Sequence, residues 1–139
     1  MKRLLPIFKA SFFVPLFGDG STKFQPVFID DVSLAVDEII NSNIEGKNIY
    51  ELAGPRIYSY KEFFNHISSF LNKTRVLVPF PMAFMKPMIN IAEKTPISPL
   101  TSEQLTLFEK DNLVVNVDKS FQNLDINPQD TLQILKNIV

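Results

Sequence analysis

The chain contains no cysteine and only one histidine, His66, among its 139 residues. The lack of cysteine excludes disulfides, thiolate metal sites and cysteine nucleophiles, and it fits a reducing compartment. A single histidine cannot form a histidine-rich metal site, so we predict no metal ligands. His66 stands beside Ile67 in a stretch with helical spacing, and we expect it to be a half-buried structural residue rather than a catalyst.

The chain also lacks an excess of charge and a long apolar run. Lys and Arg number 14 against 15 Asp and Glu, which gives a formal net charge of -1 and no basic footprint for nucleic acid. The most apolar stretch, residues 76–92, contains Lys86 and three prolines and is shorter than the ~20 apolar residues of a spanning helix. Residues 1–9 begin like a secretory signal, but Lys9 interrupts the apolar run, so an ordinary helix is expected there.

Apolar spacing predicts a helix over residues 30–41 that buries Val32, Ala35, Val36, Ile39 and Ile40. Asp30 and Asp31 could be paired acid/base carboxylates, but a helix cap is the favoured interpretation. Ser59 and Glu62 have the spacing of a capping box, which predicts a helix from there to about Leu71. Alternation predicts strands over 24–29, 48–53 and 74–78. Further helices are expected over residues 1–13, 81–93, 101–110, one turn within 118–124, and from Pro128, with Asn127 as its cap.

This order of elements predicts an α/β fold with a small, three-stranded, mostly parallel sheet and flanking helices. The length of the chain fits one domain, residues 1–139.

Short motifs, in order along the chain, resemble segments of atypical, extended short-chain dehydrogenases. They are F-Q-P-V-F-I-D-D-V at 24–32, G-K-N-I-Y-E-L-A-G-P at 46–55, S-Y-K-E at 59–62, P-L-T-S-E-Q-L at 99–105 and D-N at 111–112. Within that family, the motifs are most similar to those of the group that contains the accessory subunit of respiratory complex I and NAD-dependent epimerase/dehydratases. The resemblance implies a partial lobe of a Rossmann-type fold, with NAD(P)H as the cofactor of the full-length family.

Two signatures of that family are missing from the chain. The glycine-rich turn that holds a dinucleotide has no counterpart, since Gly18-x-Gly20 lacks a third glycine and the right flanks. The family's catalytic tyrosine is followed four residues later by lysine, whereas Tyr50, Tyr58 and Tyr60 are followed by Gly54, Glu62 and Phe64. We therefore predict no catalytic and no cofactor-binding residue, and interpret residues 1–139 as a C-terminal lobe without the N-terminal dinucleotide-binding domain.

Three polar residues are candidates for lining a ligand cleft in the parent fold: Lys23, Gln25 and Arg56. Lys23 and Arg56 border turns, where a phosphate or carboxylate could bind, and Gln25 lies on a predicted strand. The plainer alternative is that Lys23 and Arg56 are solvated charges and that Gln25 is a polar residue on an exposed strand face.

The function predicted first is that of a non-catalytic C-terminal fragment related to an NADH:quinone oxidoreductase (complex I) accessory subunit. One alternative is part of an NAD(P)-dependent sugar-nucleotide epimerase/dehydratase or reductase. Another is a structural interaction module that uses the Met- and Phe-rich residues 79–92.

Partners and location follow from this interpretation. Uncovered apolar faces predict either self-association, through residues 1–17 and the strand near Phe24, or docking on a nucleotide-binding lobe. Respiratory-complex subunits are further expected partners, and the expected location is cytoplasmic, with a place at the periphery of the inner membrane as an option.

Overall fold

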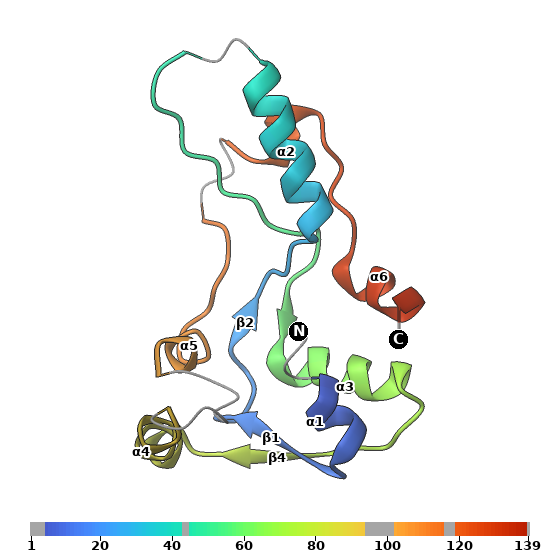
Figure 1. Cartoon of the computed structure of the whole chain (residues 1–139), viewed down its shortest axis with the longest axis vertical. Helices are drawn as coiled ribbons and strands as arrows, with labels where there is room; N and C mark the ends of the chain where they lie inside the picture. Colours follow the sequence, from blue (N-terminus) through green and yellow to red (C-terminus); the bar gives the residue numbers. More distant parts are fainter. Residues whose placement is uncertain (1–4, 43–44, 94–101, 116–118, 139) are drawn as a thin grey trace. The chain divides into compact units, whose positions relative to one another are not determined.

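The computed structural model describes residues 5–42, 45–93, 102–115 and 119–138 (Figure 1). Contacts divide the chain into two compact units. The first unit comprises residues 1–24 and 59–112, and the second comprises residues 25–58 and 113–139. Each unit has its own core of buried side chains.

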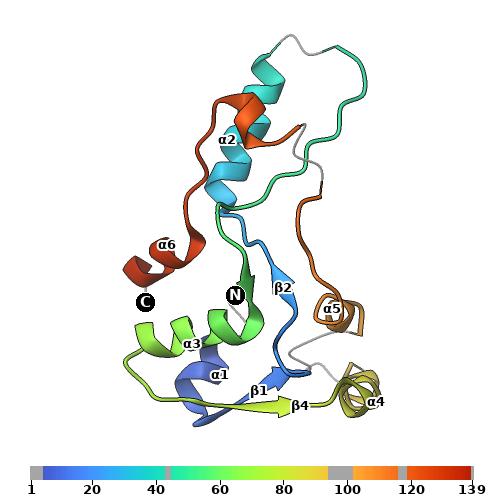
Figure 2. The same cartoon turned by 180° about the vertical axis from the view of Figure 1, so that it is seen from behind.

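The first unit is organised around a two-stranded parallel ribbon. Strands β1 (Phe13–Phe17) and β4 (Val76–Phe80) pair with Phe13 opposite Val76 and Phe17 opposite Phe80. Helices α1 (Leu5–Ala10) and α3 (Tyr60–Phe70) lie on one side of this ribbon in both views (Figures 1 and 2). Two further helices, α4 (Met82–Ala92) and α5 (Ser102–Thr106), follow β4 and contact each other.

Aromatic side chains fill the core of the first unit. Phe8 and Phe64 are almost fully buried, with ring centroids 5.2 Å apart in an edge-on arrangement. Phe17 stacks on Phe108 at 3.8 Å. Such ring pairs stabilise a core beyond the area that they bury, which gives the abundant phenylalanine a structural role.

The capping box at the start of α3 is confirmed. The backbone N–H of Glu62 donates to the Ser59 hydroxyl at 3.2 Å, and the Glu62 carboxylate accepts the Ser59 N–H at 2.8 Å. Phe63, Phe64 and Ile67 are buried, as their spacing predicts. His66, in contrast, is exposed and packs beside Phe70, so the expectation of a half-buried histidine is wrong.

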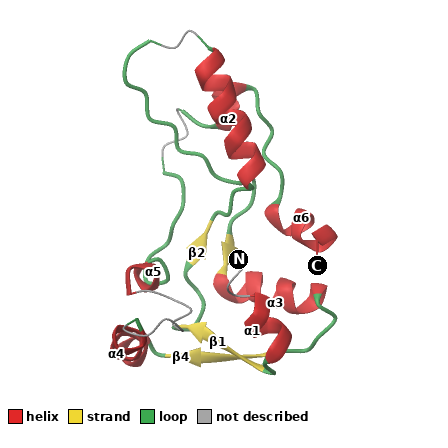
Figure 3. Cartoon of the chain, in the orientation of Figure 1, coloured by secondary structure: helices red, strands yellow, loops and turns green. Residues whose placement is uncertain are grey.

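The second unit is built on α2 (Ile29–Asn41), with the 3-10 helix η1 (Phe121–Leu124) and α6 (Thr131–Ile138) (Figure 3). Its buried core is Ala35, Phe121 and Leu124, covered by Val27, Val32, Ile39, Tyr50, Leu52 and Ile126. The predicted extent of α2 is confirmed, but only part of its predicted apolar face is covered. Val36 and Ile40 remain 48% and 74% exposed.

Asp31 does not cap α2, and this expectation is wrong. The N-cap position is Phe28, which has no side-chain cap, and Asp31 lies inside the first turn with only 1% exposure. Its carboxylate accepts the backbone N–H of Gln129 at 2.8 Å and the Gln129 side-chain amide at 3.2 Å. Since buried carboxylates are costly without such donors, this pair fixes the segment before α6 against the start of α2.

The α/β class, with a small parallel sheet and flanking helices, is confirmed, but the strands differ from those predicted. The described residues form two two-stranded sheets instead of one with three strands: β1 with β4, and β2 (Lys23–Phe24) with β3 (Tyr58–Ser59). Residues 48–53 are extended but belong to no strand, and the helix expected over 1–13 ends at Ala10, before β1.

Several predicted helix boundaries also shift. Helix α5 ends at Thr106 instead of Lys110, and Pro81 precedes α4 rather than opening it. Helix α6 begins at Thr131, where Asp130 accepts the N–H of Leu132 at 2.9 Å, so the expected start at Asn127 and Pro128 is wrong. The break expected at residues 95–99 lies outside the described residues.

A glycine contact gives a test of the second unit. A Cβ atom on Gly54 would stand 1.9 Å from the carbonyl oxygen of Pro26. We expect Gly54→Ala to lower the free energy of unfolding by at least ~1–3 kcal/mol, because backbone must move to relieve the overlap. Urea unfolding followed by circular dichroism measures this change.

The matched control is Gly46→Asn. Gly46 has a φ of +82°, and a Cβ atom added there would have no heavy atom within 4 Å. Asparagine tolerates that backbone conformation better than most residues. Equal unfolding midpoints for Gly54→Ala and the wild type would contradict the close approach of Gly54 to Pro26.

Candidate functional site

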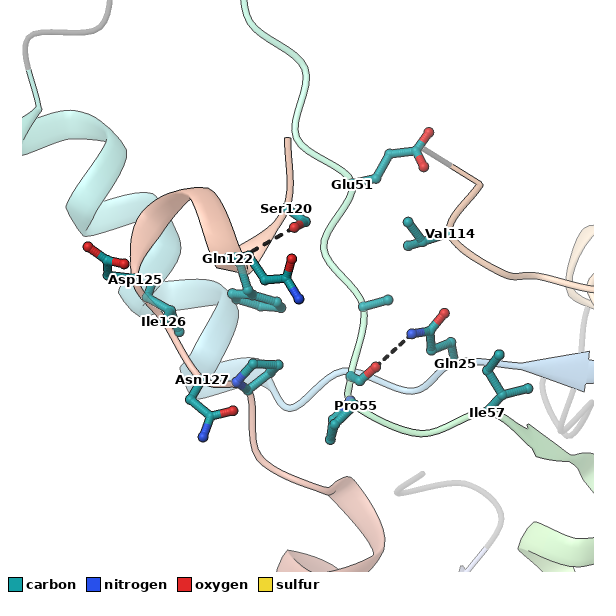
Figure 4. Close-up of a pocket in the computed structure, with 14 residues that line it drawn as sticks. Gln25, Glu51, Pro55, Ile57, Val114, Ser120, Gln122, Asp125, Ile126 and Asn127 are labelled. Carbon is teal, nitrogen blue, oxygen red and sulfur yellow. Dashed lines mark hydrogen bonds between the residues drawn. The ribbon is translucent and has the colours of Figure 1, made fainter. Parts of the chain in front are cut away.

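An open pocket of about 750 Å³ lies within the second unit (Figure 4). The extended segment around Glu51, Gly54 and Ile57 forms one wall. Residues of η1 and the segment after it, including Phe121, Gln122 and Asn127, form the other. The pocket therefore exists because residues 48–57 run past η1 without joining a sheet.

The polar side chains of the pocket are amides, carboxylates and the Ser120 hydroxyl. The Gln25 amide nitrogen donates to the carbonyl of Gly54 at 2.8 Å, which holds this side chain against the wall (Figure 4). Glu51 accepts the backbone N–H of Val115 at 3.3 Å, and Asp125 is a second carboxylate in the lining. None of the described residues that line the pocket is cationic.

This lining does not fit a dinucleotide. A pyrophosphate is normally met by Arg or Lys side chains or by clustered backbone N–H groups at a helix N-terminus. Here the two charged lining residues, Glu51 and Asp125, carry the same sign as the phosphates. The arrangement suits a neutral or cationic group that hydrogen-bonds to amides, and we derive no redox step through it.

The structure separates the three predicted ligand residues. Gln25 lines the pocket, whereas Lys23 and Arg56 do not. Lys23 belongs to the first unit, where its backbone N–H donates to the Asp111 carboxylate at 2.8 Å. The Arg56 guanidinium lies 3.2 Å from the carboxylate of Asp130, while most of its side chain stays exposed. Their role in ligand binding stays a prediction.

Asp130 lies at the centre of a cluster of polar side chains that the sequence did not predict. The Tyr58 hydroxyl donates to its carboxylate, with oxygen distances of 2.9 and 3.1 Å, and Arg56 contacts one of the same oxygens at 3.2 Å. Burial raises the pKa of the Tyr58 phenol, and the hydrogen bond to the negative Asp130 carboxylate raises it further. The sequence offered one sign of this role. Asp130 stands just before a stretch with apolar helical spacing, and an aspartate in that position is typical of a helix cap.

Tyr60 is also held in its neutral form. Its ring stacks on Phe24 at 4.4 Å and lies 4.5 Å from Phe108, and this burial raises the pKa of the Tyr60 phenol. A tyrosine that exchanges protons with a substrate near neutral pH needs a lowered pKa. Tyr58 and Tyr60 are therefore prepared to stay protonated.

Neither a metal site nor a membrane-spanning helix is found in the described part of the chain. It contains no group of three His, Cys, Asp or Glu side chains placed to hold a metal ion. Within the same residues, no helix combines the length and apolar character needed to cross a bilayer.

Two curated proteins show the relationship of the chain by sequence. It is 33% identical over 128 residues to NADH dehydrogenase [ubiquinone] 1 alpha subcomplex subunit 9, mitochondrial, of Arabidopsis thaliana, covering 84% of this chain and 31% of that protein. It is 27% identical over 109 residues to the NADH-ubiquinone oxidoreductase 40 kDa subunit, mitochondrial, of Neurospora crassa, covering 78% of this chain and 29% of that protein. The chain thus spans less than a third of these relatives, and no family model matches it.

Solved structures show the fold. Triphenylmethane reductase of Citrobacter sp. complexed with NADP(H) superposes with a TM-score of 0.72 at 17% identity, over 99% of this chain and 48% of that one. A nucleoside-diphosphate-sugar epimerase from Staphylococcus aureus gives a TM-score of 0.68 at 19% identity, over 97% of this chain and 48% of that one. The described fold is therefore about half of a reductase/epimerase fold.

The likeness to solved structures shows an α/β fold shared with reductases and an epimerase. By sequence, the chain is similar to part of two subunits of mitochondrial NADH–ubiquinone oxidoreductase. The resemblance seen in the sequence motifs is confirmed.

The two raised phenol pKa values predict a loss of stability at alkaline pH. Because Tyr58 and Tyr60 hold their protons more tightly when folded, the unfolded chain ionises first, at its usual pKa of about 10. Their contribution is therefore complete below pH ~10 and is lost as the pH rises through the raised values. The midpoint of urea unfolding, measured between pH 8 and pH 11, should fall more steeply with rising pH for the wild type than for Tyr58→Phe. Equal slopes would contradict the Tyr58–Asp130 geometry.

Proposed function

We propose that this chain is a non-catalytic lobe that serves a respiratory NADH:quinone oxidoreductase as a structural part, in the manner of the subunits to which it is related. The observation that supports the proposal most directly is that Tyr58 and Tyr60 are held in their protonated form. The Tyr58 hydroxyl donates to Asp130, and Tyr60 is stacked between aromatic rings. Both phenols have raised pKa values, which is the opposite of what proton transfer in a short-chain dehydrogenase requires.

The partners proposed are subunits of the respiratory complex, and the proposed location is cytoplasmic and peripheral to the inner membrane. Support comes from the two curated relatives, both of which are named as subunits of NADH–ubiquinone oxidoreductase. Assembly with other chains needs exposed apolar surface, and both units offer such surface.

A nucleotide-binding lobe is the partner proposed for the second unit. Ile29, Val36 and Ile40 are 67%, 48% and 74% exposed at helical spacing on α2, away from the residues that face the core. Where such a lobe covers this stripe, NAD(P)H would bind to that lobe and Gln25 would lie on the substrate side. The alternative function, part of a sugar-nucleotide epimerase/dehydratase or reductase, depends on the same partner.

Self-association through residues 1–17 and the strand near Phe24 stays a prediction, to be tested by size-exclusion chromatography with light scattering. Only part of that surface is available. Val14, Leu16 and Phe17 are buried, while Phe12 and Phe13 are 52% and 60% exposed.

A dinucleotide titration tests the proposed lack of cofactor chemistry. We expect isothermal calorimetry of the full chain with NADH and with NADPH to give no saturable heat, because the pocket presents carboxylates where phosphates would bind. The matched control is a full-length reductase of the same fold, titrated under the same conditions. Tight, stoichiometric binding of either dinucleotide to the isolated chain would overturn the proposal.

A second candidate function, an interaction module in residues 79–92, is favoured by one observation. Phe84, Met88 and Ile91 form an exposed stripe on α4, at 66%, 58% and 71% exposure. Met85 and Ile89 point inward and are buried, so Met85 belongs to the core rather than to the surface.

Substitution of the exposed stripe tests this candidate. We expect Phe84→Glu with Met88→Glu to abolish co-purification with respiratory-complex subunits while the circular dichroism spectrum is unchanged, because both side chains are solvent-facing. Leu107→Glu, at a residue that is 52% exposed in the same unit, is the control. Retained co-purification of the double variant would rule out the interaction module.

A further inference from the structure

One face of the β1–β4 ribbon is uncovered. Val14 and Leu16 are buried, whereas the alternate residue Phe13 and its neighbours across the ribbon, Val76 and Val78, are 60%, 40% and 38% exposed. Figures 1 and 2 show α1 and α3 on one side of the ribbon and no described element on the other. We call Phe12, Phe13, Pro15, Val76 and Val78 the ribbon face.

The ribbon face departs from the rule for parallel sheets. Parallel strands are normally covered by other elements on both sides, because both faces are apolar. Here Phe13 is opposite Val76 and Pro15 is opposite Val78, so apolar side chains adjoin across the pair. Phe12 adds its ring edge-on to Phe13, with centroids 5.2 Å apart. The result is an apolar patch with no cover among the described residues.

The two chain segments that form this patch are basic, although Lys86 among them is paired with Glu109 at 2.6 Å. Residues 5–18 and 71–92 contain Lys9, Lys73, Arg75 and Lys86 and no acidic residue, although the whole chain carries 15. Lys9 and Lys73 are exposed, and the Lys73 ammonium and the Arg75 guanidinium both donate to backbone carbonyls at the end of α1. These cations are therefore held beside the first residues of both strands.

This positive charge favours one of two possible partners for the ribbon face, a second copy of the chain or a lipid surface. A second copy of the chain would gain nothing from these cations, because it presents the same charge at the same face. A flat apolar face with a cationic edge instead meets two requirements of peripheral membrane binding, namely buried apolar area and attraction to anionic headgroups. Exposed lysines can reach headgroups while their aliphatic stems cover apolar surface.

We propose that the ribbon face binds an anionic lipid surface. Phe12, Phe13, Val76 and Val78 enter the boundary between headgroups and acyl chains, and Lys9 and Lys73 contact lipid phosphates. This inference deepens the peripheral location put forward under the proposed function and rests on that location.

Vesicle co-sedimentation of the full chain tests the proposal. The probes are vesicles of phosphatidylcholine alone and of equal parts phosphatidylcholine and phosphatidylglycerol. We expect the protein to sediment with the anionic vesicles and to stay in the supernatant with the neutral ones. Added salt should release it, because screening weakens the attraction between exposed charges.

Two variants with matched controls locate the surface. Lys9→Glu should weaken partition into anionic vesicles by at least about fivefold, as expected for loss of one cation near the surface. Lys47→Glu makes the same charge change at an exposed lysine of the second unit. It should alter partition into anionic vesicles only through the change in the net charge of the chain. Val78→Glu should abolish partition, whereas Ile40→Glu, on the apolar stripe of α2 beside Asp37, should not.

Three outcomes would overturn the proposal. One is equal sedimentation with neutral and anionic vesicles, and another is a Val78→Glu variant that binds as well as the wild type while its circular dichroism is unchanged. The third is no vesicle binding at all together with loss of respiratory-complex subunits from Val78→Glu, which would make the ribbon face a protein interface. None of these results depends on dinucleotide binding, so failure here is distinguishable from failure of the proposed non-catalytic role.

Discussion

The parallel pairing of β1 with β4 is the interaction on which the first unit depends. It joins residues 13–17 to residues 76–80, and the aromatic core assembles on the side where α1 and α3 lie. A two-stranded ribbon is marginal by itself and needs a packed face for stability. The packing of Val14 and Leu16, both buried, supplies that face. The other face of the ribbon has no covering element among the described residues, and the proposed lipid contact is made by this uncovered face.

The second unit is held by a different kind of contact. Three consecutive residues before and at the start of α6 attach to separate parts of the unit: Gln129 to Asp31, Asp130 to Tyr58 and Arg56, and Thr131 to the carbonyl of Pro26. These are polar contacts around a small apolar core, and they explain why a carboxylate as buried as that of Asp31 is tolerated. They also hold Tyr58 protonated, so a residue type used for catalysis in the family has a structural role here.

Local signals in the sequence predicted the elements that local interactions determine. The capping box at Ser59, the extent of α2 and the inward face of α3 follow from hydrogen bonds and spacing within a few residues. The motifs at 24–32 and 46–55 indicated the family before any contact was known. Strand β1 was missed because Pro15 is unusual inside a strand and because the pairing partner lies about sixty residues away.

The candidate site was harder to predict for the same reason. Gln25 lines the pocket, but Asp130, Tyr58 and Gln129 acquire their roles only through contacts between distant segments. Residues 48–53 alternate like a strand, yet a strand needs a hydrogen-bonded neighbour, and none pairs with them among the described residues. The unpaired strand-like segment and the uncovered ribbon both leave surface available for contact with a partner.

The central claim is that the β1–β4 ribbon has one covered and one uncovered face, and the absence of native cysteine allows a direct test. Single cysteines would be introduced as Val14→Cys and Leu16→Cys on the covered face, and as Val76→Cys and Val78→Cys on the other. Rates of thiol labelling are then compared in the native and the urea-unfolded chain. The account predicts that cysteines at 76 and 78 label at nearly the unfolded rate, while those at 14 and 16 are protected at least tenfold. Similar protection at all four positions would contradict it.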